Sequence, residues 1–195
     1  MKNLNQYIKE KLIINKDYRD GKMYHPESFD ELRKIIEDRY DKLGPGTKQN
    51  PIDFNDIDVS NLDSFYSSNT SEGIFNKILF KYIDISDWDV SNIKSMNSMF
   101  FWCDALRSVG NISGWDVSNV TDMSYMFFNC KELESVGDLS KWDVSNVTNM
   151  KYMFFGCAYF NQDLSDWNVS DVRIRNRLSM FDNCPIKNEY KPKFK

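Results

Sequence analysis

A short phrase recurs along this chain, and that recurrence constrains the fold more than any other feature. "WDVSNVTDMSYMFFNC" occupies residues 115–130, and "WDVSNVTNMKYMFFGC" occupies residues 142–157. The period is marked by Cys103, Cys130, Cys157 and Cys184 and by Trp88, Trp115, Trp142 and Trp167. The cysteines are spaced by 27 residues throughout. A fixed period of roughly 20–50 residues indicates a repeat protein in which each unit packs on the next.

Each unit contains two kinds of apolar pattern. Apolar and polar residues alternate in "WDV" at residues 142–144, which predicts a short half-buried strand. In "SNVTNMKYMFFGC" at residues 145–157, apolar residues recur at i, i+3, i+6 and i+7, which predicts a helix capped by Ser145 or Asn146. Stacked copies would cover one another, with parallel strands on one side and helices on the other.

We therefore predict an α/β repeat solenoid of the leucine-rich-repeat kind, with about 27 residues per repeat and an N-terminal helical cap. Each repeat would consist of a short parallel strand plus a helix. The cap would span residues 1–50, with helices at residues 4–12 and 26–43. Residues 51–184 would form a partial first repeat and four full repeats, and residues 185–195 a basic tail.

The repeated phrase, W-[DN]-V-S-N-V-x-x-M-x-x-M-F, resembles the repeat of the BspA-like leucine-rich-repeat surface proteins and of mycoplasma-type surface lipoproteins. The resemblance covers about residues 57–184 and keeps its register through four units. It implies a leucine-rich-repeat-type solenoid, a role in binding other molecules, and no catalytic activity. Short members of this kind are also encoded by bacteriophages and mobile elements.

The recurring apolar residues are predicted to form the core, because each would stack on its own copy in the next unit. They are Trp88, Trp115, Trp142, Trp167, Met99, Met126, Met153, Met180, Phe100, Phe127, Phe154, Phe181, Cys103, Cys130, Cys157 and Cys184. The cysteines are predicted to be a ladder of buried thiols, since zinc sites use cysteine pairs only a few residues apart.

Polar residues between the core positions are the candidates for binding a partner. A ladder of mostly acidic side chains between each Trp and Val would favour a basic partner, and a basic cluster in the last unit would hold a carboxylate or phosphate. A solvated surface without a ligand is the alternative for both. The residues are Asp89, Asp116, Asp143 and Asn168 in the acidic ladder, Asp87, Lys141 and Asp166 beside the tryptophans, and Arg173, Arg175 and Arg177 in the basic cluster.

Composition and the chain's first residues indicate where in or on a cell the protein is expected. Charged residues make up 28% of the 195 residues, and no apolar run approaches the roughly 20 residues that span a bilayer, so membrane insertion is not expected. The first residues lack the apolar core of a secretory signal, which favours the cytoplasm, that of a host cell if the protein is phage-encoded. The cell surface or a virion is the alternative.

Catalytic and cofactor chemistry is not expected. His25 is the single histidine, and nothing in the sequence places it beside a Cys or Ser nucleophile. Neither of the common glycine-rich phosphate-binding motifs occurs, and no cofactor or metal is predicted. The net charge of −4 also disfavours direct binding of nucleic acid.

The sequence therefore favours a non-enzymatic, protein-binding repeat module. We expect an intracellular protein of phage or mobile-element type that binds and modulates a bacterial protein, for example as an inhibitor. Two alternatives stay open. One is a surface adhesin or virion component of the BspA-like type, and the other is an acidic nucleic-acid mimic that inhibits a nuclease.

Overall fold

The computed structural model describes residues 23–134 and 136–194. Its elements are α2 (Phe29–Leu43), β1 (Ile52–Asp53), β2 (Tyr66–Ser67), β3 (Glu72–Gly73), β4 (Ile83–Asp84) and the 3-10 helices η1 (Ile112–Gly114), η2 (Leu139–Lys141), η3 (Ile174–Asn176) and η4 (Asn188–Tyr190). Strand β1 pairs with β4 in parallel, and β2 pairs with β3 in antiparallel orientation. Within the described residues, no helix is long and apolar enough to cross a bilayer.

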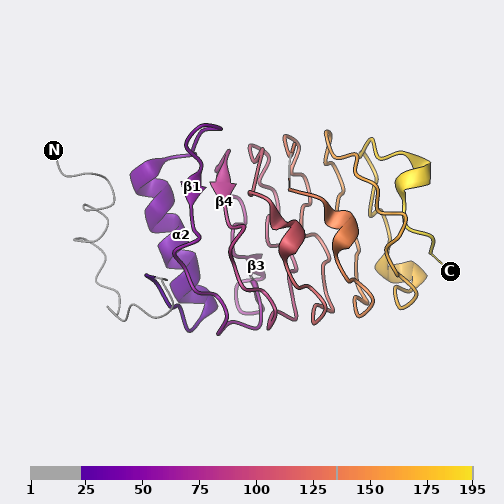
Figure 1. The fold of residues 1–195 in the computed structure, drawn as a ribbon, viewed down its shortest axis with the longest axis horizontal. Coiled ribbons are helices and arrows are strands. Elements are labelled where there is room, and N and C mark those ends of the chain that lie inside the picture. Colours follow the sequence, from indigo (N-terminus) through magenta and orange to yellow (C-terminus); the bar gives the residue numbers. More distant parts are fainter. Residues whose placement is uncertain (1–22, 135, 195) are drawn as a thin grey trace.

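Helix α2 confirms the helix predicted within residues 26–43. It begins after Ser28, whose hydroxyl accepts a hydrogen bond from the Glu31 N–H, and Gly44 ends it with a φ of 70°. The helix lies against the first repeated unit at one end of the molecule (Figure 1). The other helix predicted for the cap, at residues 4–12, lies outside the described residues.

Successive units lie side by side along the long axis of the molecule (Figure 1). They are joined by backbone hydrogen bonds between their M-x-x-M-F segments. Tyr125 N donates to Lys151 O at 2.9 Å, and Phe127 N donates to Met153 O at 2.9 Å. We call this set of bonds the backbone ladder, and it runs through residues 96–102, 122–129, 149–156 and 176–182.

The helix predicted at residues 145–157 does not form, and overlapping tight turns take its place. Met153 N donates to Met150 O at 3.2 Å, which closes one three-residue step of such a turn. The φ angles at Tyr152 and Gly156 are +58° and +73°, which interrupt any right-handed helix. Alternate N–H groups close turns, and the others reach the next unit, so the units pair through their backbones.

The strand predicted at residues 142–144 is also absent from this part of the described chain. Trp142 N instead donates to Leu139 O at 3.1 Å, at the end of η2. The parallel pairing between units therefore runs through the turn segments of the backbone ladder and not through the W-D-V segments. The physical reason is that the turns leave one unpaired N–H at every second residue, and those groups need acceptors.

The repeated apolar residues face the interior, and all are buried except Phe181 and Cys184, which are partly buried. Their rings stack between units: Phe100 on Phe127 at 5.2 Å and Phe127 on Phe154 at 5.5 Å between centroids. The core is thus a set of parallel columns that run along the molecule.

The polar atoms of the repeated tryptophans and cysteines are satisfied by carbonyl groups of the backbone. Trp142 Nε1 donates to Ile112 O at 3.0 Å, and the other repeated tryptophans make the same bond. Cys130 Sγ donates to Phe100 O at 3.1 Å, and Cys103 and Cys157 make the equivalent bond. Cys184 Sγ donates instead to Phe160 O at 3.4 Å. The repeated Trp and Cys are therefore placed to bind the backbone of the preceding unit as well as to fill the core.

Candidate binding surface

A group of aromatic side chains lies on the solvent-facing side of the backbone ladder, where three units meet. We call it the aromatic strip, and it consists of Phe101, Trp102, Tyr125, Phe128, Tyr152 and Phe155. Trp102 is 44% exposed, and the other side chains are half-buried. Each is next to a buried Met, Phe or Cys of the core, so the alternation of the turns places them on the outside.

The rings of the strip pack on one another across the units. Phe128 stacks between Phe101 and Phe155, with centroids 5.0 Å from each. Tyr125 stacks on Tyr152 with a centroid distance of 5.1 Å. These contacts fix the rings before any ligand arrives, so binding would cost little side-chain entropy.

The strip is limited at both ends by polar residues. In the unit before Trp102, the position equivalent to Trp102 is Lys77, whose N–H donates to Phe101 O in the backbone ladder. In the unit after Phe155, the equivalent position is Asp182, which is exposed. A contiguous apolar surface with a polar border is typical of an interaction site and differs from scattered exposed apolar residues.

The predicted acidic ladder is exposed, but its side chains hold local turns. Asp116 Oδ1 accepts a hydrogen bond from Ser118 N at 3.0 Å, and Asp143 Oδ1 accepts one from Ser145 N at 3.0 Å. These hydrogen bonds lower the pKa of both carboxyl groups. The same bond to the residue two positions on recurs at Asp89, Asp116, Asp143 and Asn168. Their prediction as part of a sheet face is wrong, because the ladder of parallel bonds lies elsewhere.

The predicted residues beside the tryptophans are all exposed: Asp87, Lys141 and Asp166. Asp87 N donates to Asn55 Oδ1 at 2.8 Å, and Lys141 ends η2.

The basic cluster is divided between two environments. Arg173 and Arg175 are exposed and line a pocket of about 490 Å³ beside Thr148. Arg177 is partly buried, and its guanidinium lies over the ring of Phe194 at 4.6 Å. The first two arginines are therefore available to an anion, and the third is packed against the end of the core.

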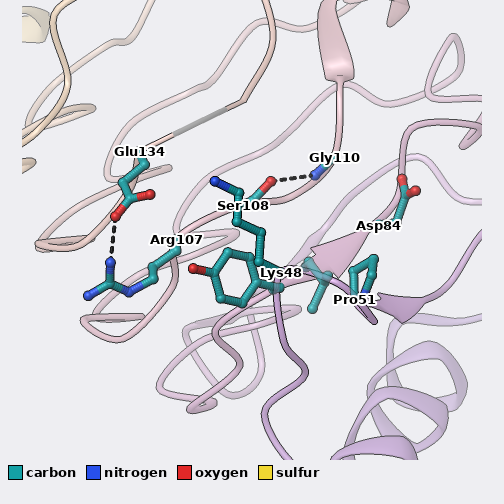
Figure 2. A pocket seen from close by; sticks show the side chains of 9 residues that line it. Lys48, Pro51, Asp84, Arg107, Ser108, Gly110 and Glu134 are labelled. Atoms are coloured by element: carbon teal, nitrogen blue, oxygen red, sulfur yellow. Dashed lines mark hydrogen bonds and ion pairs between the residues drawn. The ribbon is translucent and has the colours of Figure 1, made fainter.

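A second pocket, of about 310 Å³, lies beside β1 and β4 (Figure 2). Arg107 projects into it and pairs with Glu132 at 2.6 Å and with Glu134. Lys48 and Asp84 also line the pocket. Because two carboxylates already pair with the arginine, its guanidinium is little available to an anionic ligand.

The surroundings of the histidine and of the buried cysteines bear on catalysis and metal binding. His25 Nδ1 lies 3.1 Å from Asp58 Oδ2. Burial raises the pKa of the Cys103 thiol to about 12 and that of Cys130 well above its usual value, which keeps both protonated. Among residues 23–134 and 136–194, no group of three or more His, Cys, Asp or Glu side chains is placed to hold a metal ion.

The aromatic strip is the part of the surface that the sequence analysis missed. Its signal is the second Phe of each Met-Phe-Phe triplet, at Phe101, Phe128 and Phe155. In the turns these residues face outward and stack directly on their own copies.

Comparisons with known proteins place the chain in a family. No curated protein and no solved structure gave a match. Residues 69–193, more than half of the chain, match the model of a family described as "Mycoplasma protein of unknown function, DUF285". The matched range includes the backbone ladder, the aromatic strip and the basic cluster. The chain therefore belongs to this family, whose function is unknown.

Proposed function

We propose that this chain is a non-enzymatic repeat module that binds a protein partner through the aromatic strip. The observation that carries the proposal is the set of stacked, partly exposed rings centred on Phe128, with polar residues at both ends. Interface hot spots are enriched in such aromatic anchors, surrounded by groups that exclude water.

The proposal includes the architecture predicted from the sequence, a leucine-rich-repeat-type solenoid with about 27 residues per repeat. The likeness of the repeated phrase to BspA-like proteins supports it, and so do the hydrogen bonds between successive units. Extended faces built from stacked units are the surfaces that such proteins use for binding.

A protein is favoured over a nucleic acid as the occupant of the strip. Stacking on aromatic rings also binds bases, but it does so in grooves lined by cations. Here Lys151 is the cation that touches the strip, 5.3 Å from the ring of Tyr152, and the net charge of the chain is −4. A partner surface with exposed apolar side chains fits this chemistry. A bacterial protein as partner and action in the cytoplasm stay predictions from the sequence.

The test uses substitutions that the chain itself contains at equivalent positions. Trp102 corresponds to Asn129 and Asn183, and Tyr125 and Tyr152 correspond to Ser98 and Ser179. The variant Trp102→Asn/Tyr125→Ser/Tyr152→Ser should therefore keep the turns and remove three of the six rings of the strip. Tyr159→Ser is the matched control, because Tyr159 is 60% exposed and lies outside the strip.

Wild type, triple variant and control are immobilised and exposed to bacterial lysate, with and without nuclease treatment. A protein that both wild type and control retain is then purified. The Kd of this protein is measured for wild type, for the triple variant and for the control. We expect the triple variant to bind at least about 100-fold more weakly, as for the loss of hot-spot residues worth about 2.8 kcal/mol. Equal affinity of the triple variant, or retention that disappears on nuclease treatment, would contradict the proposal.

A further inference from the structure

The peptide groups of the backbone ladder all point in the same direction. The peptide between Lys151 and Tyr152 accepts from Tyr125 N at 2.9 Å and donates to Leu178 O at 3.0 Å. Continuous chains of hydrogen-bonded peptides therefore run along the molecule from unit to unit. Their dipoles add, as they do in a helix, so the two ends of the ladder carry opposite partial charges.

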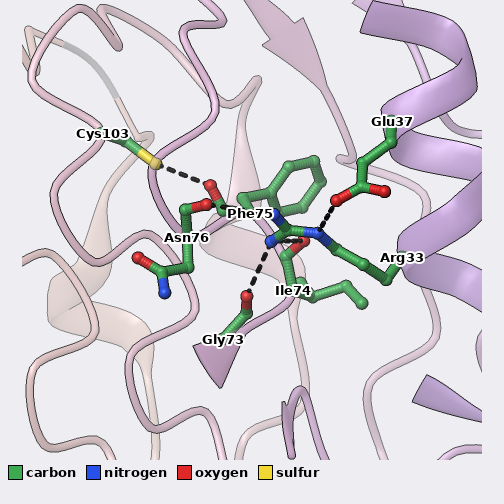
Figure 3. Close-up of polar contacts among 7 residues, drawn as sticks. All are labelled: Arg33, Glu37, Gly73, Ile74, Phe75, Asn76 and Cys103. Atoms are coloured by element: carbon green, nitrogen blue, oxygen red, sulfur yellow. Dashed lines mark hydrogen bonds and ion pairs between the residues drawn. The ribbon is translucent and has the colours of Figure 1, made fainter. Parts of the chain in front are cut away.

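The end with free carbonyls is closed by α2 (Figure 3). Arg33 Nη1 donates to Gly73 O and Ile74 O, each at 3.1 Å, and its Nη2 donates to Asn76 O at 3.3 Å. Glu37 holds the guanidinium in place at 2.6 Å. At Ile74 O and Asn76 O the arginine thus supplies the donors that a preceding unit would supply, whereas Gly73 O also accepts the turn bond from Asn76 N.

The opposite end of the ladder has donors without acceptors. Tyr152 N, Phe154 N and Gly156 N each donate to the last unit at 2.9–3.0 Å. The equivalent groups in the last unit are the N–H groups of Ser179, Phe181 and Asn183. None of them has an acceptor among residues 23–134 and 136–194. A row of donors along an edge is a template for pairing with another chain.

Three arginines precede this row of donors in the last unit, whereas Asp171 lines the same pocket and the exposed Asp182 lies within the row. Arg173 and Arg175 are exposed beside the 490 Å³ pocket and form no ion pair within the described residues. Arg177 has a buried Nη1 without a hydrogen-bond partner in the described structure. Leu178 and Ile174, 47% and 69% exposed, add apolar surface at the same end. Backbone N–H groups, positive dipole ends and arginines all favour an anionic ligand that also presents acceptors.

We propose that this end of the ladder binds an extended acidic polypeptide segment. Carbonyl groups of the segment would accept from the N–H groups of Ser179, Phe181 and Asn183, and its carboxylates would pair with Arg173 and Arg175. The donors form a row and do not converge on one point, which favours a peptide over a small anion. A second copy of this chain cannot fill the place with its own ladder, because Arg33 occupies the matching carbonyls.

The test titrates the protein with a capped twelve-residue peptide of alternating Glu and Thr, with a Lys-Thr peptide for comparison. We expect the Glu-Thr peptide to bind and to move the NMR amide proton signals of Ser179, Phe181 and Asn183 downfield, as new hydrogen bonds do. The double variant Arg173→Gln/Arg175→Gln should bind it about tenfold or more weakly, equal to about 1.4 kcal/mol. The control Lys94→Gln/Lys131→Gln removes the same charge from exposed positions elsewhere and should bind as wild type does.

Three results would overturn the proposal. The first is equal affinity for both peptides, and the second is binding that does not move these amide signals. The third is displacement of the Glu-Thr peptide by inorganic phosphate at a concentration equal to the Kd of the peptide. The last would assign the site to a small anion. Because both arginines are exposed, unchanged unfolding midpoints in urea are expected for the double variant. Loss of the aromatic strip should leave this binding intact, so the proposed function and this inference fail separately.

Discussion

The indole of Trp142 lies parallel to that of Trp115, with centroids 6.3 Å apart and an interplanar angle of 3°. Trp167 stacks on its other side at 6.4 Å. The same indole donates its N–H to Ile112 O in the preceding unit. One side chain therefore joins three units by packing and by a buried hydrogen bond.

Replacing Trp142 by Ala should lower the free energy of unfolding by about 3–5 kcal/mol, because it removes a buried ring and leaves the Ile112 carbonyl unpaired. Urea denaturation followed by circular dichroism measures this. Trp102→Asn is the matched control, since Trp102 is 44% exposed, and it should change stability by about 0.5 kcal/mol or less. A loss well under 1 kcal/mol for Trp142→Ala would mean that the column of tryptophans does not hold the units together.

Arg33→Ala should destabilise the protein by about 1–3 kcal/mol, because it removes the donors of carbonyls at the end of the ladder. The ion pair with Glu37 accounts for little of this, so Glu37→Gln should cost about 0.5 kcal/mol or less. The N–H groups of Phe75 and Lys77 donate the first hydrogen bonds of the ladder to the next unit. Their hydrogen exchange should become faster in Arg33→Ala but not in Glu37→Gln. Equal effects of both substitutions would assign the role of Arg33 to the ion pair.

The buried thiols should resist alkylation in the folded protein. At pH 8, iodoacetamide should modify Cys184 first, since it is only partly buried, and Cys103, Cys130 and Cys157 only after unfolding. Mass spectrometry after timed quenching gives the order. Fast modification of Cys130 would show that the core opens readily at the middle units.

Stability should also fall at high pH for the same reason. Burial raises the pKa of Cys103 to about 12 in the folded protein, whereas the unfolded thiol ionises near its usual value of about 8.5. The stability associated with the protonated thiol is complete below the unfolded pKa and is lost as pH rises toward the folded one. Between pH 9 and 12, the stability advantage of wild type over Cys103→Ala should shrink by up to about 1.4 kcal/mol per pH unit. A difference that stays constant would contradict burial of this thiol.

Binding of the protein partner should depend weakly on salt. Among the described residues, Lys151 contacts the aromatic strip and Lys77 borders it, but the strip itself is uncharged. Binding through Asp116 and Asp143 would instead depend on charge. We expect Kd to change by less than about threefold between 0.1 and 0.5 M NaCl. A steep loss of affinity, together with a similar loss in Asp116→Asn/Asp143→Asn, would favour the acidic ladder as the binding surface.

The sequence predicted the period, the core residues and α2, because each is encoded by residue type and spacing. It did not predict the turns. Val147, Met150, Met153 and Phe154 have the spacing of a helix face, but overlapping turns bury residues at the same spacing. The choice between a helix and overlapping turns depends on backbone pairing between units, and this pairing joins residues that are far apart in the sequence.

One local signal for the turns was present. The position equivalent to Trp102 is Asn129, Gly156 and Asn183 in the later units, and each has a positive φ. Asn and Gly are the residues that enter this conformation most readily. Their recurrence every 27 residues argues against a helix, and it also places the preceding Phe on the outer face.

The measurement that tests the account most directly is hydroxyl-radical footprinting of the protein with and without its purified partner. We predict that oxidation of Trp102, Tyr125 and Tyr152 falls several-fold on binding, while that of Tyr159, which is 60% exposed and outside the strip, does not change. Unchanged oxidation of the strip beside protection elsewhere would show that the partner binds another face, and the aromatic strip would then have no part in recognition.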